Sequence, residues 1–297
     1  MIFTNIMNLP QPLVSFCQAD EYKTADNEWR VTSLLKGTRE AILERRHSVE
    51  VSRDVSDMIW LLFGTAVHGV LEAQEERETQ FKEERIRVPV GDYLLSGKFD
   101  LFDTETHTVI DYKTASVWKI KFGDFSDWRR QTLIYCWMLR KCGFEADRAE
   151  VVAFLKDHNK REAKLKSDYP PMPVHKEQFE FTARDFAEVE DWLHNKFEEI
   201  REAEKLPDDQ LPLCTMEQRF NSGDKYAVKK KGRKTALRVL DSREEAELYM
   251  MNNGGDAIEH RPGEDKKCID YCSVCRFCDY WQELQMTEED RLKEVSE

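Results

Sequence analysis

The chain has 297 residues, of which 40% are hydrophobic and 35% are charged, with a formal net charge of −13. This length allows one elaborated domain or two modest ones, each with its own core and a very polar surface. The acidic balance argues mildly against indiscriminate nucleic-acid binding. No basic segment precedes an apolar stretch at the N-terminus, and no uninterrupted apolar run approaches the ~18 residues of a membrane span. We therefore expect a globular protein that does not engage a membrane.

The predicted elements alternate between helices and strands. Residues 1–28 are expected to be an irregular arm. Helical spacing begins near Thr32, and a stronger helical run covers about 54–77. The later elements, in chain order, are two strands around Gly91 within 84–102, a strand at 109–115, a helix from Ser126 or Asp127 to Gly143, a strand at 149–156, a helix at 183–205, a hairpin at 225–238 and a short helix at 242–253. This order indicates an α/β fold with a mixed sheet flanked by helices.

The strand VIDYKTAS, residues 109–116, places Asp111 and Lys113 on one face. Asp100 ends the strand SGKFDLF, which the turn DTETH is expected to pair with VIDYK, so that Asp100 and Asp111 come close together. Two neighbouring carboxylates repel unless one binds a proton or both bind a cation. Mg²⁺ accepts such a pair, and Lys113 could then orient or deprotonate an attacking water. A cross-strand salt bridge is the alternative explanation.

Two further features are weak indicators of a functional site when each is considered alone. His68 in FGTAVHGVLE lies on a helix whose other face is apolar, where most histidines are core residues. Gln131 and Tyr135 lie at i and i+4 on the helix that follows the VIDYK strand, which is also common packing.

Together the four pieces, in this order, resemble the RecB-like branch of the PD-(D/E)XK nuclease superfamily. They are G-x-x-x-H at Gly64 and His68, G-x-x-D at Gly97 and Asp100, D-x-K at Asp111 and Lys113, and Q-x-x-x-Y at Gln131 and Tyr135. The resemblance covers roughly residues 30–160. The sequence segments that flank this region are similar to those of bacteriophage members of the branch.

The resemblance implies a restriction-endonuclease-like fold and a metal-dependent DNA nuclease. His68, Asp100, Asp111 and the backbone carbonyl of Tyr112 would bind Mg²⁺ or Mn²⁺, Lys113 would serve the attacking water, and Gln131 and Tyr135 would shape the site and touch the DNA. It also implies work in DNA recombination or processing, in the bacterial cytoplasm or that of a phage's host, with recombination or replication proteins as partners.

The chain has eight cysteines, and four of them fall within residues 268–278. This density is too high for an ordinary disulfide framework and suggests metal binding in a reducing cytoplasm. The spacing C-x₃-C-x₂-C also occurs in radical S-adenosylmethionine enzymes, but there it comes early and βα repeats follow it, so we reject that interpretation. Cys136 and Cys142 are expected to be buried fillers of a core helix.

RecB-like nucleases that include AddB and the CRISPR-associated exonucleases bind a [4Fe–4S] cluster through one early and three late cysteines. Cys272 and Cys278 match their C-x₅-C spacing, and Cys268 stands before them. The early cysteine is missing, because Gly37 and Thr38 occupy its place. The predicted fourth ligand is Cys214, with Cys275 or, less favoured, Cys17 as alternatives. Structural Zn²⁺ and free thiols remain alternatives to the cluster.

The segment Lys225–Arg238 carries seven basic residues and no acidic one. It is predicted to be a hairpin turning near Gly232, which either contacts phosphates or is simply solvated. The predicted DNA-contacting residues are Lys229, Lys230, Lys231 and Arg233 of this hairpin, and Arg129 and Arg130 at the start of the helix that carries Gln131.

The sequence therefore predicts an arm (1–30), a nuclease core (31–205) and a basic, cysteine-rich extension (206–297). The predicted activity is that of an exonuclease acting on DNA single strands or ends. The alternatives are a non-catalytic DNA-binding module of nuclease fold and a structure-specific or RNA-directed endonuclease. The oligomeric state is not indicated.

Overall fold

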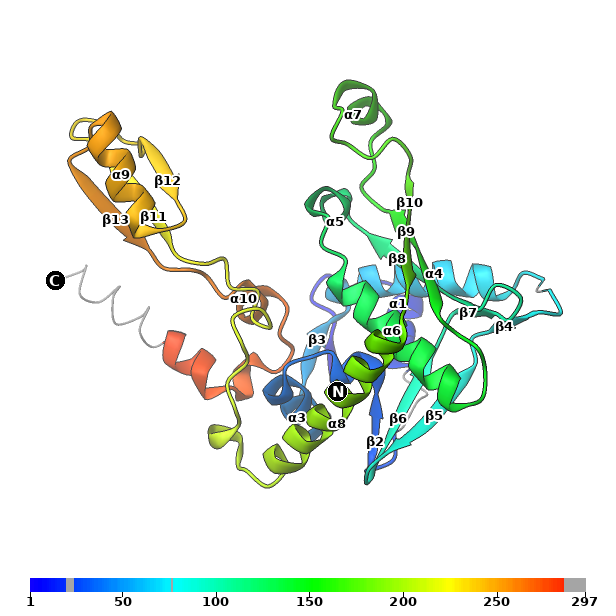
Figure 1. The fold of residues 1–297 in the computed structure, drawn as a ribbon. Coiled ribbons are helices and arrows are strands. Elements are labelled where there is room, and N and C mark those ends of the chain that lie inside the picture. The colour runs from blue at the N-terminus through cyan, green and yellow to red at the C-terminus, as the bar shows by residue number, and fades with distance from the viewer. Residues whose placement is uncertain (20–23, 76, 286–297) are drawn as a thin grey trace. The chain divides into compact units, whose positions relative to one another are not determined.

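The computed structural model describes residues 1–19, 24–75 and 77–285 (Figure 1). The chain divides into two compact units. Unit 1 comprises Met1–Lys36 and Ser48–Lys205, and unit 2 comprises Gly37–His47 and the chain from Leu206 onward. Residues 37–47, which the sequence placed in the predicted core, thus group with the C-terminal extension.

The main sheet of unit 1 has five strands in the order β10-β9-β8-β7-β4. β8 and β9 are parallel, and the remaining neighbours are antiparallel. The strands are β4 (Gln80–Lys82), β7 (Leu101–Asp103), β8 (Thr108–Ala115), β9 (Arg148–Leu155) and β10 (Val174–Glu180). Inward residues such as Val109, Val151 and Ala153 are fully or almost fully buried, because alternate positions of β8 and β9 face the core.

Unit 1 contains two smaller sheets. One has the order β2-β6-β5, and in the other β1 pairs parallel with β3. Their strands are β1 (Ile2–Thr4), β2 (Glu28–Arg30), β3 (Ser52–Asp54), β5 (Arg85–Val90) and β6 (Tyr93–Lys98). The N-terminal segment, expected to be irregular, therefore contributes regular structure.

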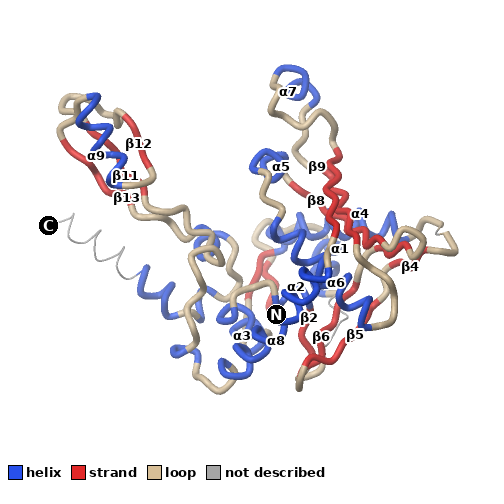
Figure 2. The backbone as a smooth tube through the Cα atoms, viewed as in Figure 1, coloured by secondary structure: helices blue, strands red, loops and turns tan. Residues whose placement is uncertain are grey.

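Helices flank these sheets, as Figure 2 shows in blue beside the red strands. Those of unit 1 are α1 (Gln11–Gln18), α2 (Val31–Leu34), the 3₁₀ turn η1 (Val55–Met58), α4 (Ile59–Glu72), α5 (Val117–Phe122), α6 (Ser126–Lys141), α7 (Lys160–Leu165) and α8 (Ala183–Ala203). α8 begins with a capping box between Thr182 and Asp185. The predicted mixed α/β architecture with flanking helices is confirmed.

The stretch YLLSGKFDLF, predicted to be one strand, is broken in two at Phe99 and Asp100. β6 before the break belongs to the sheet with β2 and β5, whereas β7 after it pairs with β8. The break has a local cause. The carboxylate of Asp100 accepts a hydrogen bond from the backbone of Tyr112 on β8, and its carbonyl accepts one from Glu83 N.

The helical run predicted for 54–77 is shorter, because η1 and α4 span only Val55–Glu72. This stretch has 18 residues and a mean hydropathy of 1.2, and 11% of it is buried, so by length and composition alone it could cross a membrane. Asp57 and His68 interrupt its apolar run. Such a stretch is weak grounds for a membrane assignment.

Unit 2 combines a short N-terminal helix with the C-terminal region. Its elements are α3 (Thr38–Arg46), η2 (Asp208–Gln210), β11 (Lys225–Lys229), β12 (Arg238–Leu240), α9 (Arg243–Asn253), β13 (Ala257–Arg261), α10 (Lys266–Asp270) and η3 (Cys275–Phe277). β11 and β12 form the predicted hairpin, with Gly232 at φ 84°, and β13 pairs with the other edge of β11. The helical spacing near Thr32 is split, because Gly37 is extended at φ −60°, ψ 143°.

Candidate functional site

A histidine and two carboxylates from three parts of unit 1 lie together. The Nδ1 atom of His68 on α4 is 3.2 Å from Asp100 Oδ1 and 3.7 Å from Glu83 Oε1. One ligand atom from each of the three residues lies within 4.8 Å of the other two. An imidazole nitrogen and two carboxylate oxygens in this arrangement can bind a divalent cation.

Glu83 is the member of this group that the sequence did not reveal. It lies between β4 and β5 with φ +53°, a conformation that is uncommon for a non-glycine residue. Its carboxylate forms an ion pair with Lys98, and its side chain is 13% exposed. In the run FKEERIRV nothing distinguishes Glu83 from Glu84, so only the fold shows which of them faces Asp100.

The two acids hold a proton on His68. Hydrogen bonds to Asp100 and Glu83 raise the pKa of the His68 imidazole to about 10, although burial opposes the shift. Burial favours protonation of Glu83, but hydrogen bonds from His68 and Lys98 outweigh it and lower the pKa of that carboxyl. Without a metal ion, the group is therefore a protonated histidine held by two carboxylates. A metal ion bound there would replace the proton.

Asp111 and Lys113 on β8 form a second, more deeply buried pair. The Nζ atom of Lys113 is 3.1 Å from Asp111 Oδ1 and 2.8 Å from Oδ2, and only the first contact has hydrogen-bond geometry. Asp111 is 3% exposed, so its Oδ2 is a buried oxygen without a hydrogen bond. Burial raises the pKa of Asp111, Lys113 opposes this shift, and the negative charge of Asp100 adds to it. A buried carboxylate oxygen without a hydrogen bond is able to serve as a ligand of a metal cation.

Asp100 links the two groups. Its Oδ1 contacts His68, while its Oδ2 accepts a 2.6 Å hydrogen bond from the backbone nitrogen of Tyr112, the residue after Asp111. The structure therefore brings His68, Asp100, Asp111 and Lys113 into one neighbourhood. Asp111 itself lies outside the 4.8 Å group of His68, Glu83 and Asp100.

Gln131 and Tyr135 of α6 complete this neighbourhood. Gln131 Oε1 accepts a 3.1 Å hydrogen bond from Lys113 Nζ, and its Nε2 donates to the Tyr135 hydroxyl at 3.3 Å. Burial, together with the charge of Asp111, raises the pKa of Tyr135, so that its hydroxyl stays protonated. A Cβ atom on Gly97 would lie 2.7 Å from Cε1 of Tyr135, which explains why that position must be glycine.

Arg129 and Arg130, predicted to contact DNA, face α8. Arg129 forms an ion pair with Asp185 and lies over the Phe181 ring at 5.3 Å, and Arg130 lies over Trp192 at 5.5 Å. Both line a hollow between the start of α6 and α8.

Five cysteines of unit 2 line one cavity. They are Cys214, Cys268, Cys272, Cys275 and Cys278. Apolar side chains, among them Leu43, Val274 and Trp281, form much of the remaining wall. Burial raises the pKa of Cys268 to about 11 and that of Cys272 to about 12, so these thiols are neutral unless a cation stabilises the thiolates.

The cysteine sulfurs are not packed as four zinc ligands. Within the described ranges, no three of them lie within 4.8 Å of one another. Tetrahedral Zn–S bonds of 2.3 Å would hold four sulfurs about 3.8 Å apart.

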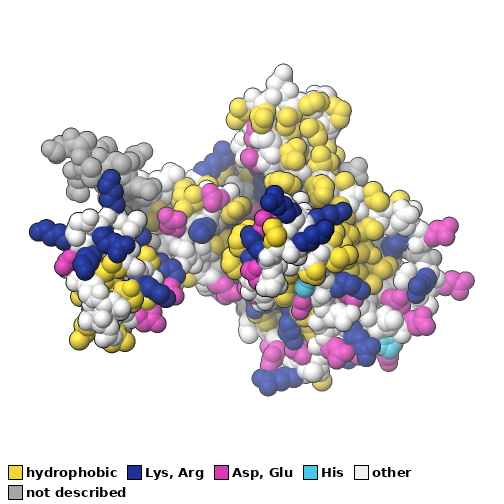
Figure 3. Space-filling model, turned by 90° about the horizontal axis from the view of Figure 1, so that it is seen from above, with side chains coloured by type: hydrophobic (Ala, Val, Ile, Leu, Met, Phe, Trp, Pro, Cys, Tyr) yellow, Lys and Arg dark blue, Asp and Glu magenta, His cyan; other side chains and the backbone are white. Residues whose placement is uncertain are grey.

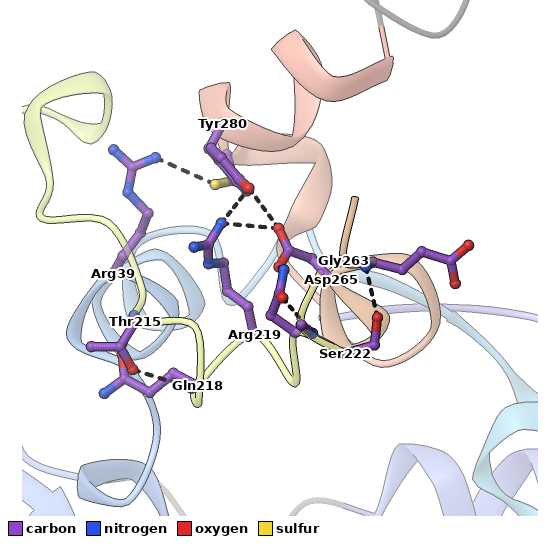
Figure 4. Close-up of polar contacts among 12 residues, drawn as sticks. Arg39, Thr215, Gln218, Arg219, Ser222, Gly263, Asp265 and Tyr280 are labelled. Atoms are coloured by element: carbon purple, nitrogen blue, oxygen red, sulfur yellow. Dashed lines mark hydrogen bonds and ion pairs between the residues drawn. The ribbon is translucent and has the colours of Figure 1, made fainter. Parts of the chain in front are cut away.

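Cys214 lies beside Gly37. A Cβ atom on Gly37 would meet the Cys214 sulfur at 2.8 Å and the Gln218 side chain at 2.9 Å. Gln218 in turn accepts a hydrogen bond from Thr215 N, and Thr215 Oγ1 accepts one from Gln218 N (Figure 4). The sulfur of Cys214 thus packs against the residue that precedes α3.

Charged side chains brace this region of unit 2. Arg39 donates a 3.4 Å hydrogen bond to the Cys278 sulfur, and Arg219 contacts both Asp265 and Tyr280 (Figure 4). Asp265 is 6% exposed and also accepts a hydrogen bond from the Tyr280 hydroxyl. These contacts link α3, through Arg39, to Cys278, and they link Arg219 to Asp265 and Tyr280.

The other three cysteines lie elsewhere. Cys17 packs with Val55 and Met58 in a small apolar cluster of unit 1, and Cys136 is fully buried in α6. Cys142, predicted to be buried, is exposed, because it follows the last residue of α6.

The predicted DNA-contacting residues of the hairpin lie at its turn. Lys229 ends β11 and forms an ion pair with Glu259 at 3.0 Å, while Lys230, Lys231 and Arg233 are exposed in the loop between β11 and β12.

One comparison with known proteins identifies a family. Residues 18–219 match the model of the PD-(D/E)XK nuclease superfamily. No curated protein matches the chain. Among solved structures, one described as SSO0001 has a TM-score of 0.42 at 16% identity and covers 63% of this chain and 81% of its own.

Two further solved structures are exonucleases by description. LHK-Exo in complex with dAMP has a TM-score of 0.33 at 13% identity and covers 60% of this chain and 93% of its own. A phage related exonuclease from Haemophilus somnus 129PT has a TM-score of 0.28 at 9% identity, with 64% and 80% covered. The family match, which spans the histidine–carboxylate group, Asp111, Lys113 and Gln131, shows that the chain belongs to the PD-(D/E)XK nuclease superfamily.

Proposed function

We propose that the protein is a metal-dependent DNA exonuclease of the RecB-like branch, acting on single strands or DNA ends during recombination or processing. The observation that carries the proposal is the convergence of His68, Glu83 and Asp100 beside the buried Asp111–Lys113 pair. We further propose a bacterial cytoplasmic setting, that of the host if a phage encodes the protein, and recombination or replication proteins as partners.

The site residues have separable roles. His68, Asp100, Asp111 and the Tyr112 carbonyl would bind Mg²⁺ or Mn²⁺, and we add Glu83 because its carboxylate lies in the same group. The bound cation would supply a Lewis acid for the phosphate and lower the pKa of water.

Lys113 is held by two partners on one side of the site. Its ammonium lies 3.1 Å from both Asp111 Oδ1 and Gln131 Oε1, which fixes its direction. From there it can orient the attacking water and stabilise the negative charge that builds up on the phosphate oxygens. Tyr135 fixes Gln131 in turn.

Incubation with end-labelled DNA and Mg²⁺ or Mn²⁺ tests this proposal. We expect mononucleotides or short oligonucleotides to be released from a single-stranded or duplex end, while closed circular DNA stays intact. Cleavage of the circle would favour the endonuclease alternative, and preference for an RNA substrate would favour the RNA-directed one. Binding without cleavage under either metal would favour a non-catalytic module.

The affinity of the site for a metal ion should still depend on pH at neutral and mildly alkaline pH. An unperturbed histidine would compete with a metal ion only below about pH 6.5. Because the pKa of His68 is raised to about 10, its proton must leave when a metal ion binds at neutral pH. Metal affinity should therefore rise with pH through the neutral and mildly alkaline range.

Titration calorimetry with Mn²⁺ at pH 8, in buffers of different ionisation enthalpy, measures the proton directly. We expect about one proton released per metal ion in the wild type, and none from His68→Gln. Equal proton counts in the two proteins would remove His68 from the ligand set.

The cysteine cavity of unit 2 supports a second metal centre. We propose a [4Fe–4S] cluster bound by Cys214, Cys268, Cys272 and Cys278, with Zn²⁺ as the alternative metal and Cys275 as the alternative fourth ligand. The five cysteines that line one cavity support a thiolate-bound centre, and the position of Cys214 beside Gly37 supports Cys214 as the fourth ligand.

The hairpin turn is proposed as a phosphate contact. Lys230 and Arg233 are exposed there, and no ion pair involves either of them among the described residues. An exposed cation without an acidic partner is available to a phosphate at a lower cost than one in an ion pair.

A further inference from the structure

Two exposed aromatic groups flank the end of β8 that follows the site. Trp60 on α4 is 61% exposed, and Trp118 and Phe122 on α5 are 58% and 78% exposed. The Trp118 and Phe122 rings stack with centroids 6.0 Å apart. Exposed aromatic side chains that gather in one patch can mark a binding surface.

Lysines accompany the rings. Lys156 Nζ lies 4.0 Å from the centroid of Trp60, and Lys121 Nζ lies 4.8 Å from that of Trp118. Lys121 also pairs with Asp168, whereas no ion pair involves Lys156 within the described part of unit 1. Figure 3, which looks onto the end of unit 1 that carries α5 and α7, shows hydrophobic side chains gathered beside Lys and Arg side chains.

Backbone contacts fix the two groups to the same strand end. Lys156 N donates to the carbonyl of Ala115, the last residue of β8. Asp157 accepts hydrogen bonds from Ser116 Oγ and Val117 N, directly before Trp118. The aromatic groups are therefore held at the point where β8 leaves the site and α5 begins.

Trp60 lies on the same helix as the candidate metal ligand His68. Trp60, Gly64 and His68 recur every four residues on one side of α4, so Trp60 lies two turns, or about 12 Å, from His68 along the helix. Gly64 between them lies over β8, where an added Cβ atom would be 3.6 Å from Thr114 Oγ1.

We propose that Trp60, Trp118 and Phe122 form a stacking track for the bases of a DNA single strand on its way to the site. This inference rests on the proposed nuclease function and names the form of its substrate. Unpaired bases expose the flat faces that aromatic rings stack on, and their phosphates meet lysines, whereas the paired bases of a duplex are covered. A protein partner would favour an apolar centre depleted of lysine instead.

Binding of fluorescent oligo-dT to the full-length protein in EDTA tests the track without cleavage. We expect Trp60→Ala and Trp118→Ala each to weaken binding about tenfold, the effect of losing one stacked base, and Trp60→Phe to retain most of the affinity. Lys156→Ala should reduce the slope of the logarithm of affinity against the logarithm of salt concentration by about one. Blunt duplex should bind all these proteins equally.

The matched control is Phe81→Ala. Phe81 is an aromatic residue that is 41% exposed on β4, at the opposite edge of the five-stranded sheet from β9 and β10, and its loss should not change oligo-dT binding. If Trp60→Ala binds oligo-dT as tightly as the wild type while both cleave DNA, the track is wrong and the nuclease function stands. If the wild type neither binds nor cleaves nucleic acid, the proposed function itself fails.

Two further measurements test whether a membrane or a second copy of the chain binds this surface. Capture of the protein by anionic phospholipid vesicles that is lost in Trp60→Ala would assign α4 to a membrane. A change of sedimentation coefficient in Trp60→Ala would assign it to a second copy of the chain. Either result, with unchanged oligo-dT binding, overturns the proposal.

Discussion

Replacing Asp111 with asparagine should abolish DNA cleavage without destabilising the protein. The substitution keeps the shape of the side chain but removes the charge that a cation needs, and loss of several kcal/mol of transition-state stabilisation lowers the rate by about 10³-fold or more. Stability should behave differently. Burial raises the pKa of Asp111, so its charged form is disfavoured in the folded state, and without metal the variant should melt at the same temperature or higher.

Asp103→Asn is the matched control. Asp103 is an equally buried aspartate, 5% exposed on the neighbouring β7, but hydrogen bonds from Gln80 and from the backbone of Glu105 and Thr106 outweigh burial and lower the pKa of its carboxyl. Its charge stabilises the fold above the pKa of an unfolded aspartate, so this variant should melt earlier yet cleave normally. End-labelled DNA assays and thermal melts with EDTA or Mn²⁺ measure both properties.

The two aspartates therefore have opposite expected signatures. In the wild type Mn²⁺ should raise the melting temperature, and this increase should be lost in Asp111→Asn but kept in Asp103→Asn. Lys113→Ala should lose activity while keeping the increase, since the lysine is not a ligand. An Asp111→Asn protein that cleaves at a rate near the wild type would contradict the site.

The sequence could predict the parts of the site that depend on local periodicity. Alternation along β8 puts Asp111 and Lys113 on one face, and the i, i+4 spacing puts Gln131 and Tyr135 on one face of α6, and the members of each pair are hydrogen-bonded to each other. The need for glycine at Gly97 follows from the packing of Tyr135, which only the fold shows.

The missed features depend on contacts between distant segments. Glu83 faces His68 only because the chain breaks at Asp100 and because Glu83 adopts a positive φ. Similarly, the spacing near Thr32 is helical on both sides of Gly37, but the second half packs with residues after Leu206. Periodicity describes each helix correctly and carries no information on which unit it joins.

Replacing Cys272 with serine should destabilise unit 2 and leave unit 1 folded. If the cavity binds a metal centre, the binding free energy, about 10 kcal/mol or more for a structural zinc, is largely folding free energy. The variant should therefore lose the centre, with several kcal/mol of stability, and become prone to proteolysis after residue 206. Metal analysis should give iron and sulfide for a cluster, with brown protein, or one zinc per colourless chain.

Cys142→Ser is the control for the loss of a thiol. Cys142 is exposed at the end of α6 in unit 1, so its replacement should change neither metal content nor stability. Unchanged metal content in Cys272→Ser, or no metal in the wild type purified without oxygen, would leave the cysteines as free thiols and contradict the centre.

The same measurement identifies the fourth ligand. The Cys214 sulfur lies beside Gly37, at the place where a Cβ atom would collide with it, so Cys214 is held by packing with the start of α3. Cys275 lies in η3, within the interval between Cys272 and Cys278. We expect Cys214→Ser to lose the centre and Cys275→Ser to keep it. The reverse result would make the four local cysteines the ligand set, and Gly37 would then be required only to make room for a packed thiol.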